Sequence, residues 1–384
     1  MSVLNTASIS GISVFRFQDV TLRYLGLVPP QTTRYRYLYY LYSFILNAFI
    51  TIGYPTHLMI GLFKMQQKAD IFKNMCVTFT CIACSIKIIA FWWRLPQVRK
   101  TYNIILKLDR RITHPDDIKL YKSTILLSVK RVLIFVITMS LSAFSASEMA
   151  TIIVGIMSEW RLMNPAYFPF EIEQSAWHYA VAHIYQASGV VMNFQTCITD
   201  SFPSMVLAML AGHIRLLGIR VARIGKQSTN AHNIELQQCI EDYKDLLDFR
   251  ATIQSIVSVG TFAQLLATGI NMCVVIFYML FYVNDVAWYI YYVVYLVAIS
   301  MEIFPQCYYG TCAEMEFEKL TYALFSCNWM DQSAAFKKNL RIFAEQTLRK
   351  QIILAGGLFP VNLDTFFATL KGAYSLYAVV KQMK

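Results

Sequence analysis

Apolar stretches with few charged residues recur along the whole chain. A membrane-spanning helix needs about 20 mostly apolar residues. Six stretches clearly meet this requirement, and a seventh is less apolar because it contains Asp364 and Lys371. Their approximate ranges are 36–64, 73–94, 132–157, 174–212, 250–285, 286–312 and 352–380. The pattern predicts an all-α membrane protein with seven transmembrane helices.

Lysine and arginine are distributed unevenly between the connections. The second connection, 94–131, holds ten of them, whereas the third has only Arg161 beside three glutamates. Basic residues favour the cytoplasmic side of a membrane. With seven spans, this asymmetry predicts a cytoplasmic N-terminus and an extracellular C-terminus.

Composition agrees with a membrane protein. Of the 384 residues, 57% are apolar and 15% are Asp, Glu, Lys or Arg, whereas soluble domains carry roughly 25% charged residues. The net charge of +11 is concentrated in the connections. We therefore attribute it to membrane topology and contact with lipid headgroups, and we expect no nucleic-acid partner.

Motifs that carry enzyme chemistry are missing from the sequence. It has no Gly-x-Ser-x-Gly, His-Glu-x-x-His or phosphate-loop pattern. Cys81-x-x-Cys84 lies inside an apolar stretch without a second pair, and His178 and His183 are five positions apart rather than the three or four that share a helix face. We expect no metal, no cofactor and no enzyme activity.

The C-terminal region resembles the signature of insect odorant receptors. It contains Thr321-Tyr322-Ala323, Trp329, an amphipathic segment at 335–351, Ala355-Gly356-Gly357-Leu358-Phe359, Leu363-Asp364-Thr365-Phe366 and Ala373-Tyr374-Ser375-Leu376. The family often has a proline after the Arg349-Lys350-Gln351 position, which this chain lacks. The break before the last helix must then depend on the glycine pair 356–357, since glycine tolerates the backbone angles of a sharp turn.

This resemblance implies a function and a division of the chain. The connection at about 212–249 is short, unlike that of the family's shared co-receptor, so the chain resembles a ligand-tuned subunit. Such a subunit joins the co-receptor in a hetero-oligomer, expected to be a tetramer, that forms an odorant-gated, non-selective cation channel in the plasma membrane of olfactory sensory neurons. The expected parts are a six-span bundle with the odorant pocket (1–312), a cytoplasmic anchor segment (313–351) and a pore-lining seventh helix (352–384).

The resemblance also assigns candidate residues to the pore and to the ligand site. Ser375, Val379, Gln382 and Met383 share one face of the last helix and are expected to line the pore and its gate. A small volatile organic ligand needs an apolar, partly aromatic cavity with few polar groups. The residues expected to line it are Met75, Phe79, Ser140, Phe144, Ser147, His178, Val181, Tyr185, Tyr289 and Tyr292.

Five ionisable residues lie inside the spans, namely Lys87, Glu148, Asp200, Glu302 and Asp364. Charges in lipid are costly, so these side chains should face protein or water. We favour interior polar bonding, although a transporter would also use such residues. Seven apolar spans are also compatible with a G-protein-coupled receptor or a gustatory-type receptor.

Overall fold

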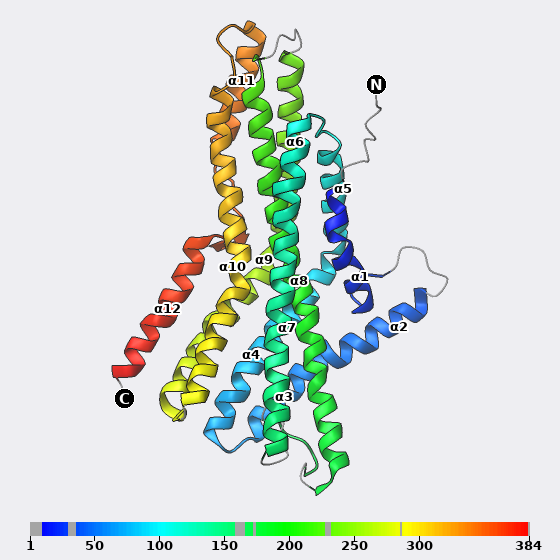
Figure 1. The fold of residues 1–384 in the computed structure, drawn as a ribbon, viewed down its shortest axis with the longest axis vertical. Coiled ribbons are helices and arrows are strands. Elements are labelled where there is room, and N and C mark those ends of the chain that lie inside the picture. Colours follow the sequence, from blue (N-terminus) through cyan, green and yellow to red (C-terminus); the bar gives the residue numbers. More distant parts are fainter. Residues whose placement is uncertain are drawn as a thin grey trace.

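The computed structural model describes residues 10–29, 36–157, 166–171, 174–226, 232–284 and 286–382. Most of the long helices run along one axis and form an elongated bundle (Figure 1). We call the end that holds α6 and α11 the α11 end. The end with the α3–α4 and α9–α10 connections is the opposite end.

The chain begins with short elements and continues with long helices. A 3-10 turn (Gly11–Phe15) leads into α1 (Arg16–Tyr24). The first long helical segment consists of α2 (Arg36–Asn47), a π-helical turn (Ala48–Gly53) and α3 (Tyr54–Lys64). After it come α4 (Lys68–Trp93), α5 (Leu95–Asp109), α6 (Pro115–Leu120), a second π turn (Tyr121–Ile125), α7 (Leu126–Met157), α8 (Ala176–Arg223), α9 (His232–Tyr282) and α10 (Val286–Phe325).

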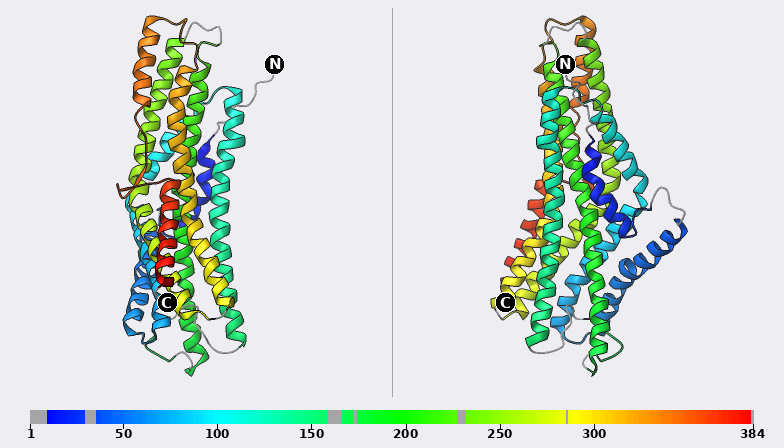
Figure 2. Two further views of the ribbon diagram at one scale, coloured as in Figure 1. Left: turned by 90° about the vertical axis from the view of Figure 1, so that its left-hand side faces the viewer. Right: turned by 45° about the vertical axis from the view of Figure 1, so that its right-hand side comes forward.

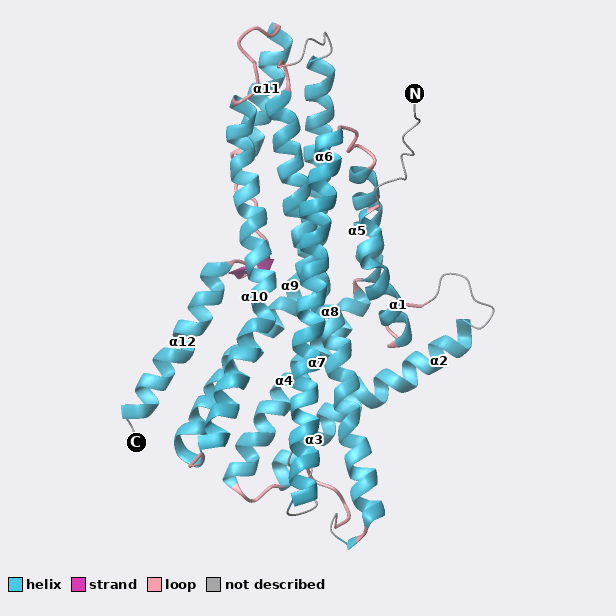
Figure 3. Ribbon diagram, viewed as in Figure 1, coloured by secondary structure: helices cyan, strands magenta, loops and turns pink. Residues whose placement is uncertain are grey.

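The remaining elements are α11 (Ala334–Thr347), the strands β1 (Leu354–Ala355) and β2 (Phe359–Pro360), and α12 (Leu363–Gln382). Apart from the two short strands, the described chain is helices and connections (Figure 3). Each predicted span coincides with a long helical segment. Five of these segments, within 36–64, 68–93, 176–223, 232–282 and 288–325, are long and apolar enough to cross a membrane. The other two predicted spans correspond to α7 and α12, so the all-α, seven-span prediction is confirmed.

Three helices extend well beyond the predicted spans. α8 has 48 residues, α9 has 51 and α10 has 40. At about 1.5 Å per residue, α9 is roughly 75 Å long, more than twice the ~30 Å hydrocarbon core of a bilayer. The predicted connection at 212–249 is therefore mostly helical, and the boundary predicted at 312/313 falls inside the unbroken helix α10.

The N-terminal segment is anchored in the core of the bundle. The ring of Phe15 is fully buried and lies 6.0 Å from Phe202 of α8 and 5.5 Å from Tyr102 of α5. The backbone N–H of Gly11 donates to the buried carboxylate of Asp109 at 2.7 Å. Apolar burial and a buried charge-assisted hydrogen bond thus fix this segment against α5 and α8.

The glycine pair produces the predicted break before the last helix. Gly356 and Gly357 have φ values of +61° and +72° and connect β1 to β2 in a tight antiparallel hairpin. Both residues of such a turn need positive φ, which glycine adopts without a steric penalty. α12 begins only at Leu363, after this hairpin, and not at the predicted position 352. The side chain of Asn362, just before α12, accepts a hydrogen bond from the N–H of Thr365 in the first turn of α12.

The hairpin and the residues just before it lie along α9 and form hydrogen bonds with three successive turns of that helix. Arg250 donates to the carbonyl of Ile352 at 2.8 Å. Gln254, one turn further on, accepts from the N–H of Leu354 at 2.8 Å and donates to its carbonyl at 2.6 Å. One more turn along, the carbonyl of Ser258 accepts from the N–H of Gly356 at 2.9 Å. The register of the segment before α12 is thereby fixed to α9.

Candidate ligand-binding and pore regions

α12 is attached to the bundle along only part of its surface. Ala373 belongs to a buried cluster with Met272 and Ile276 of α9 and Ile299 of α10. Figures 1 and 2 show α12 at the side of the bundle, diverging from α10 toward the C-terminus. The part of α12 that the structure describes thus has one packed face.

The predicted pore residues lie away from that packed face. Ser375 and Gln382 are exposed, and Val379 is 55% exposed. Met383 lies outside the described residues. A helix face that alternates apolar and polar side chains without covering neighbours in the same chain is available to water or to other subunits. The assignment of these four residues to a pore stays a prediction.

Tyr185 lies in an aromatic cluster near the opposite end of the bundle. Its ring is 4.9 Å from His57, 5.4 Å from Phe49 and 6.0 Å from Tyr54, all in the first span. Phe168, in the connection before α8, is 6.2 Å away. The sequence did not single out the first span as a ligand-binding element, although Tyr54 and His57 share a helix face at a spacing of three.

Tyr292 lies in a second aromatic cluster. It is 8% exposed, and its ring is 5.1 Å from Tyr278 of α9. Cys76 of α4 and Val275 and Met279 of α9 belong to the same buried cluster. Tyr289, three residues earlier, is 42% exposed. The two tyrosines predicted from the sixth span therefore have different surroundings.

The other predicted ligand residues are more dispersed. Met75 and Phe79 are half-buried on α4, and Val181 of α8 is exposed. The ring of His178 lies 5.0 Å from that of Phe170. The side chains of Ser140, Phe144 and Ser147 lie outside the described residues. Tyr185 and Tyr292, the two most closely packed aromatic candidates, belong to different clusters, so the described residues do not form one closed set.

A charged cluster lies between the two aromatic clusters and the α11 end. Lys87 of α4 is 4% exposed, and its Nζ lies 2.7 Å from Asp200 Oδ2 of α8 and 3.3 Å from Glu302 Oε1 of α10. It also donates to Gln264 of α9. An ammonium group has three donors, and all three are used here. We call these four residues the Lys87 cluster.

The Lys87 cluster explains three of the five ionisable residues in the spans. Lys87, Asp200 and Glu302 lie on different helices but bond to one another, as interior polar bonding requires. A buried charge without partners is far more costly than a paired one. Gln264 was not a candidate, because a glutamine within an apolar stretch gives little indication of its partner.

Further polar contacts follow the same face of α9. Thr261 donates to Gln306 of α10 at 2.9 Å, and Asn271 donates to Thr80 of α4 at 2.5 Å. Positions 261, 264, 268 and 271 share one helix face at spacings of three and four, and all four side chains are buried.

Among the described residues, no group of three or more His, Cys, Asp or Glu is arranged to hold a metal ion.

Comparison with known proteins agrees with this architecture. Residues 67–374 match the profile of the family described as 7tm Odorant receptor. Odorant receptor 59a of Drosophila melanogaster is 30% identical over 98% of both chains. Odorant receptor 33c of the same species is 35% identical over 90% of this chain and 91% of its own.

Two solved structures have a similar fold. The insect olfactory receptor OR5 from Machilis hrabei has a TM-score of 0.82 at 16% identity, covering 97% of this chain and 98% of its own. The same receptor in complex with eugenol has a TM-score of 0.83 at 16% identity and covers 97% and 100%. The similarity extends over nearly the full length of both chains.

Proposed function

Since the chain belongs to the 7tm odorant receptor family, we propose that it is the odorant-binding subunit of an odorant-gated, non-selective cation channel. Members of this family are sensory receptors and not enzymes. The observation that carries the channel proposal is the exposed face of α12, where Val379 and Gln382 point away from the contacts with α9 and α10. The chain supplies one wall of the pore, and other subunits supply the rest.

The proposed membrane orientation follows from the basic connections. The α11 end, which carries the connection at 94–131, faces the cytoplasm, and the opposite end faces the outside. Odorants bind in the outer half of the bundle, around Tyr185 or Tyr292. Both clusters offer aromatic surface for dispersion contacts and hydroxyl groups for one or two hydrogen bonds. A complex of the Machilis hrabei receptor with eugenol supports a small organic ligand.

The proposed gating route passes through α9. α9 contributes Tyr278 to the Tyr292 cluster, Gln264 to the Lys87 cluster and Gln254 to the hairpin before α12. A ligand that prefers one arrangement of α9 over another shifts the population toward it. Because the hairpin is hydrogen-bonded to α9, a movement of α9 displaces the hairpin and with it the start of the pore helix.

Whole-cell recording tests this function. Cells expressing the chain together with an odorant receptor co-receptor should give fast cation currents with some members of an odorant panel. Cells expressing either protein alone should lack those responses. The proposal fails if no panel member evokes current while both proteins are detected at the cell surface. Currents without the co-receptor would instead show that the chain assembles with itself.

Two matched pairs of variants test the candidate sites. Tyr185→Ala should raise the half-maximal odorant concentration, whereas Ile184→Ala, at an exposed neighbouring position, should not. Gln382→Glu should change the relative permeability to divalent and monovalent cations, because it adds charge to the pore wall. Lys381→Gln, on a different face of α12, should have a smaller effect. Equal effects within either pair would remove that residue from its site.

A further inference from the structure

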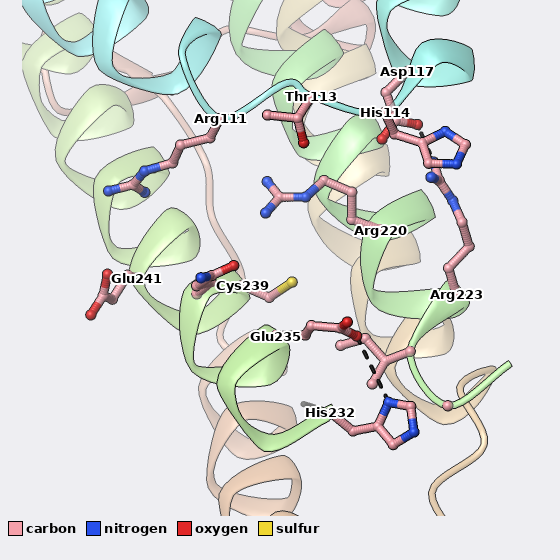
Figure 4. Close-up of a pocket in the computed structure, with 13 residues that line it drawn as sticks. Arg111, Thr113, His114, Asp117, Arg220, Arg223, His232, Glu235, Cys239 and Glu241 are labelled. Atoms are coloured by element: carbon pink, nitrogen blue, oxygen red, sulfur yellow. Dashed lines mark hydrogen bonds and ion pairs between the residues drawn. The ribbon is translucent and has the colours of Figure 1, made fainter. Parts of the chain in front are cut away.

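A polar cavity of about 460 Å³ lies at the α11 end, far from both aromatic clusters. It is bounded by the connection after α5, by the last turns of α8 and by the first turns of α9 (Figure 4). Its lining includes Arg111, His114, Arg220, Arg223, Glu235 and Gln238. The proposed odorant and pore functions use none of these residues.

Two buried carboxylates hold the three arginines in place. Asp242 of α9 accepts hydrogen bonds from Arg111 and from Arg220, and Asp117 of α6 accepts from Arg223. Both aspartates are buried, whereas each arginine side chain remains 24–29% exposed. The arginines therefore do not need to be ordered when a ligand binds, which lowers the entropic cost of binding.

The guanidinium groups retain hydrogen-bonding capacity. Each has five N–H donors in a planar fork. Among the described residues, Arg220 uses one terminal nitrogen for Asp242, and Arg223 uses one for Asp117. Figure 4 shows Arg111 and Arg220 extending to the same side of the cavity from different segments. Two such forks next to each other match the oxygens of a phosphate group.

The acidic residues of the lining restrict where an anion fits. Glu235 and His232, whose side chains lie 3.9 Å apart, are both on the wall formed by the first turns of α9. Figure 4 shows Glu241 beyond Cys239, at the edge of the lining residues. Arg111 Nη1 also lies 3.0 Å from Asp245 Oδ2, so the three arginines are balanced by the carboxylates of Asp117, Asp242 and Asp245. All three arginines line the cavity, whereas Asp242 and Asp245 do not, so the Arg111–Arg220 wall presents guanidinium donors rather than carboxylates. An anion is therefore attracted to the Arg111–Arg220 wall and repelled from the Glu235 wall.

We propose that this cavity binds a phosphate-bearing small molecule through Arg111 and Arg220. Gln238 lies at the exposed rim and Cys239 at the back. Cys239 is 11 residues from Arg250, where the apolar stretch of α9 begins, which is about 16 Å along the helix. A lipid headgroup lies at the boundary of that stretch, so a soluble phosphate compound fits the position better than a membrane lipid.

Calorimetric titration of the full-length chain in nanodiscs tests the site, with tripolyphosphate as the probe. Wild type should bind. Arg220→Gln should bind at least about tenfold more weakly, since one charge-assisted contact is worth that factor or more. Asp242 keeps Arg111 as its partner in this variant, so no buried carboxylate is left unpaired.

A second pair of variants avoids any change to the arginines. Gln238→Glu adds a negative charge at the rim and should weaken binding by about tenfold. Gln237→Glu adds the same charge at an exposed neighbouring position outside the lining and should change it much less. Equal binding by wild type, Arg220→Gln and Gln238→Glu would overturn the proposal, as would the absence of binding to wild type at millimolar tripolyphosphate.

The source of the phosphate is distinguished by lipid composition. Nanodiscs of phosphatidylcholine alone and nanodiscs with added phosphatidylinositol bisphosphate should bind tripolyphosphate with the same affinity. If the phosphoinositide competes and Arg220→Gln removes that competition, the cavity accepts lipid headgroups and the soluble ligand proposed here is wrong. Odorant-evoked currents report the separate proposal for the outer half of the bundle.

Discussion

Gly310 of α10 lies directly against the short segment between the hairpin and α12. A Cβ atom built there would lie 1.9 Å from the carbonyl oxygen of Val361 and 3.0 Å from its carbonyl carbon. These are backbone atoms, so no side-chain rotation relieves the contact. Gly310→Ala must therefore move either α10 or the segment that leads into α12.

The required movement follows from the same distances. An ordinary contact begins at 3.4 Å, so the two segments must separate by 3.4 − 1.9 = 1.5 Å. This shift is enough to disrupt the hydrogen bond from Val361 N to Ile353 O (2.8 Å) or that from Leu363 N to Thr311 Oγ1 (2.9 Å). Overpacking costs about 1–3 kcal/mol, and each lost bond costs about 1 kcal/mol. We expect a total loss of about 2–5 kcal/mol.

The assay is the temperature at which half of the detergent-solubilised receptor loses its monodisperse peak in size-exclusion chromatography. Gly310→Ala should lower this temperature by several degrees. Gly269→Ala is the control, because it also replaces a helical glycine in a long helix but would meet nothing within 4 Å. If the two variants lose the peak at the same temperature, the close contact with Val361 does not constrain the fold and the reasoning is refuted.

Three other variants test the remaining contacts. Gln254→Ala removes two hydrogen bonds to the hairpin, worth about 1 kcal/mol each, and should raise the half-maximal odorant concentration about 5- to 30-fold; an unchanged dose–response curve would contradict this. Lys87→Met leaves the buried carboxylate of Asp200 without its ammonium partner, which should cost about 3–5 kcal/mol of folding stability. Surface biotinylation should therefore detect little receptor, and the double variant Lys87→Met/Asp200→Asn should recover part of the surface expression. Burial raises the pKa of Asp19, despite the hydrogen bond from Tyr102, so stability should fall as pH rises from its ordinary value of 3.8 through the raised one. Asp19→Asn should remove that fall from a melting series against pH, and a series that still follows wild type would disprove it.

The sequence predicted the features that depend on local pattern. The apolar stretches indicated all seven spans, because burial in lipid requires a long run of apolar residues wherever the chain folds. Gly356 and Gly357 indicated the break before α12, since adjacent positive φ angles are readily adopted only by glycine. The amphipathic stripe of α11 was also visible. α11 buries Phe336, Leu340 and Phe343 of the segment predicted at 335–351, whereas Leu348, just after the last residue of the helix, is 71% exposed.

Features that depend on long-range contacts were not predictable in this way. Asp200 and Glu302 lie 113 and 215 positions from Lys87, and hydropathy gives no register between helices. The contribution of His57 to the Tyr185 cluster arises from the packing of the first span against α8. The extension of α8 and α9 toward the α11 end was missed for another reason, because charged helices and charged loops have the same hydropathy.

The position of the Lys87 cluster restricts how the bundle can rearrange. Its side chains come from α4, α8, α9 and α10, so moving any one of these helices breaks or lengthens a bond to a buried charge. Breaking such a bond without a replacement is too costly for a continuous deformation. α9 also holds the hairpin through Arg250 and Gln254. If the chain forms the proposed pore, its opening requires either that these helices move together or that Glu302, the more exposed partner, exchanges Lys87 for another polar contact. Either route would be a switch between two discrete arrangements.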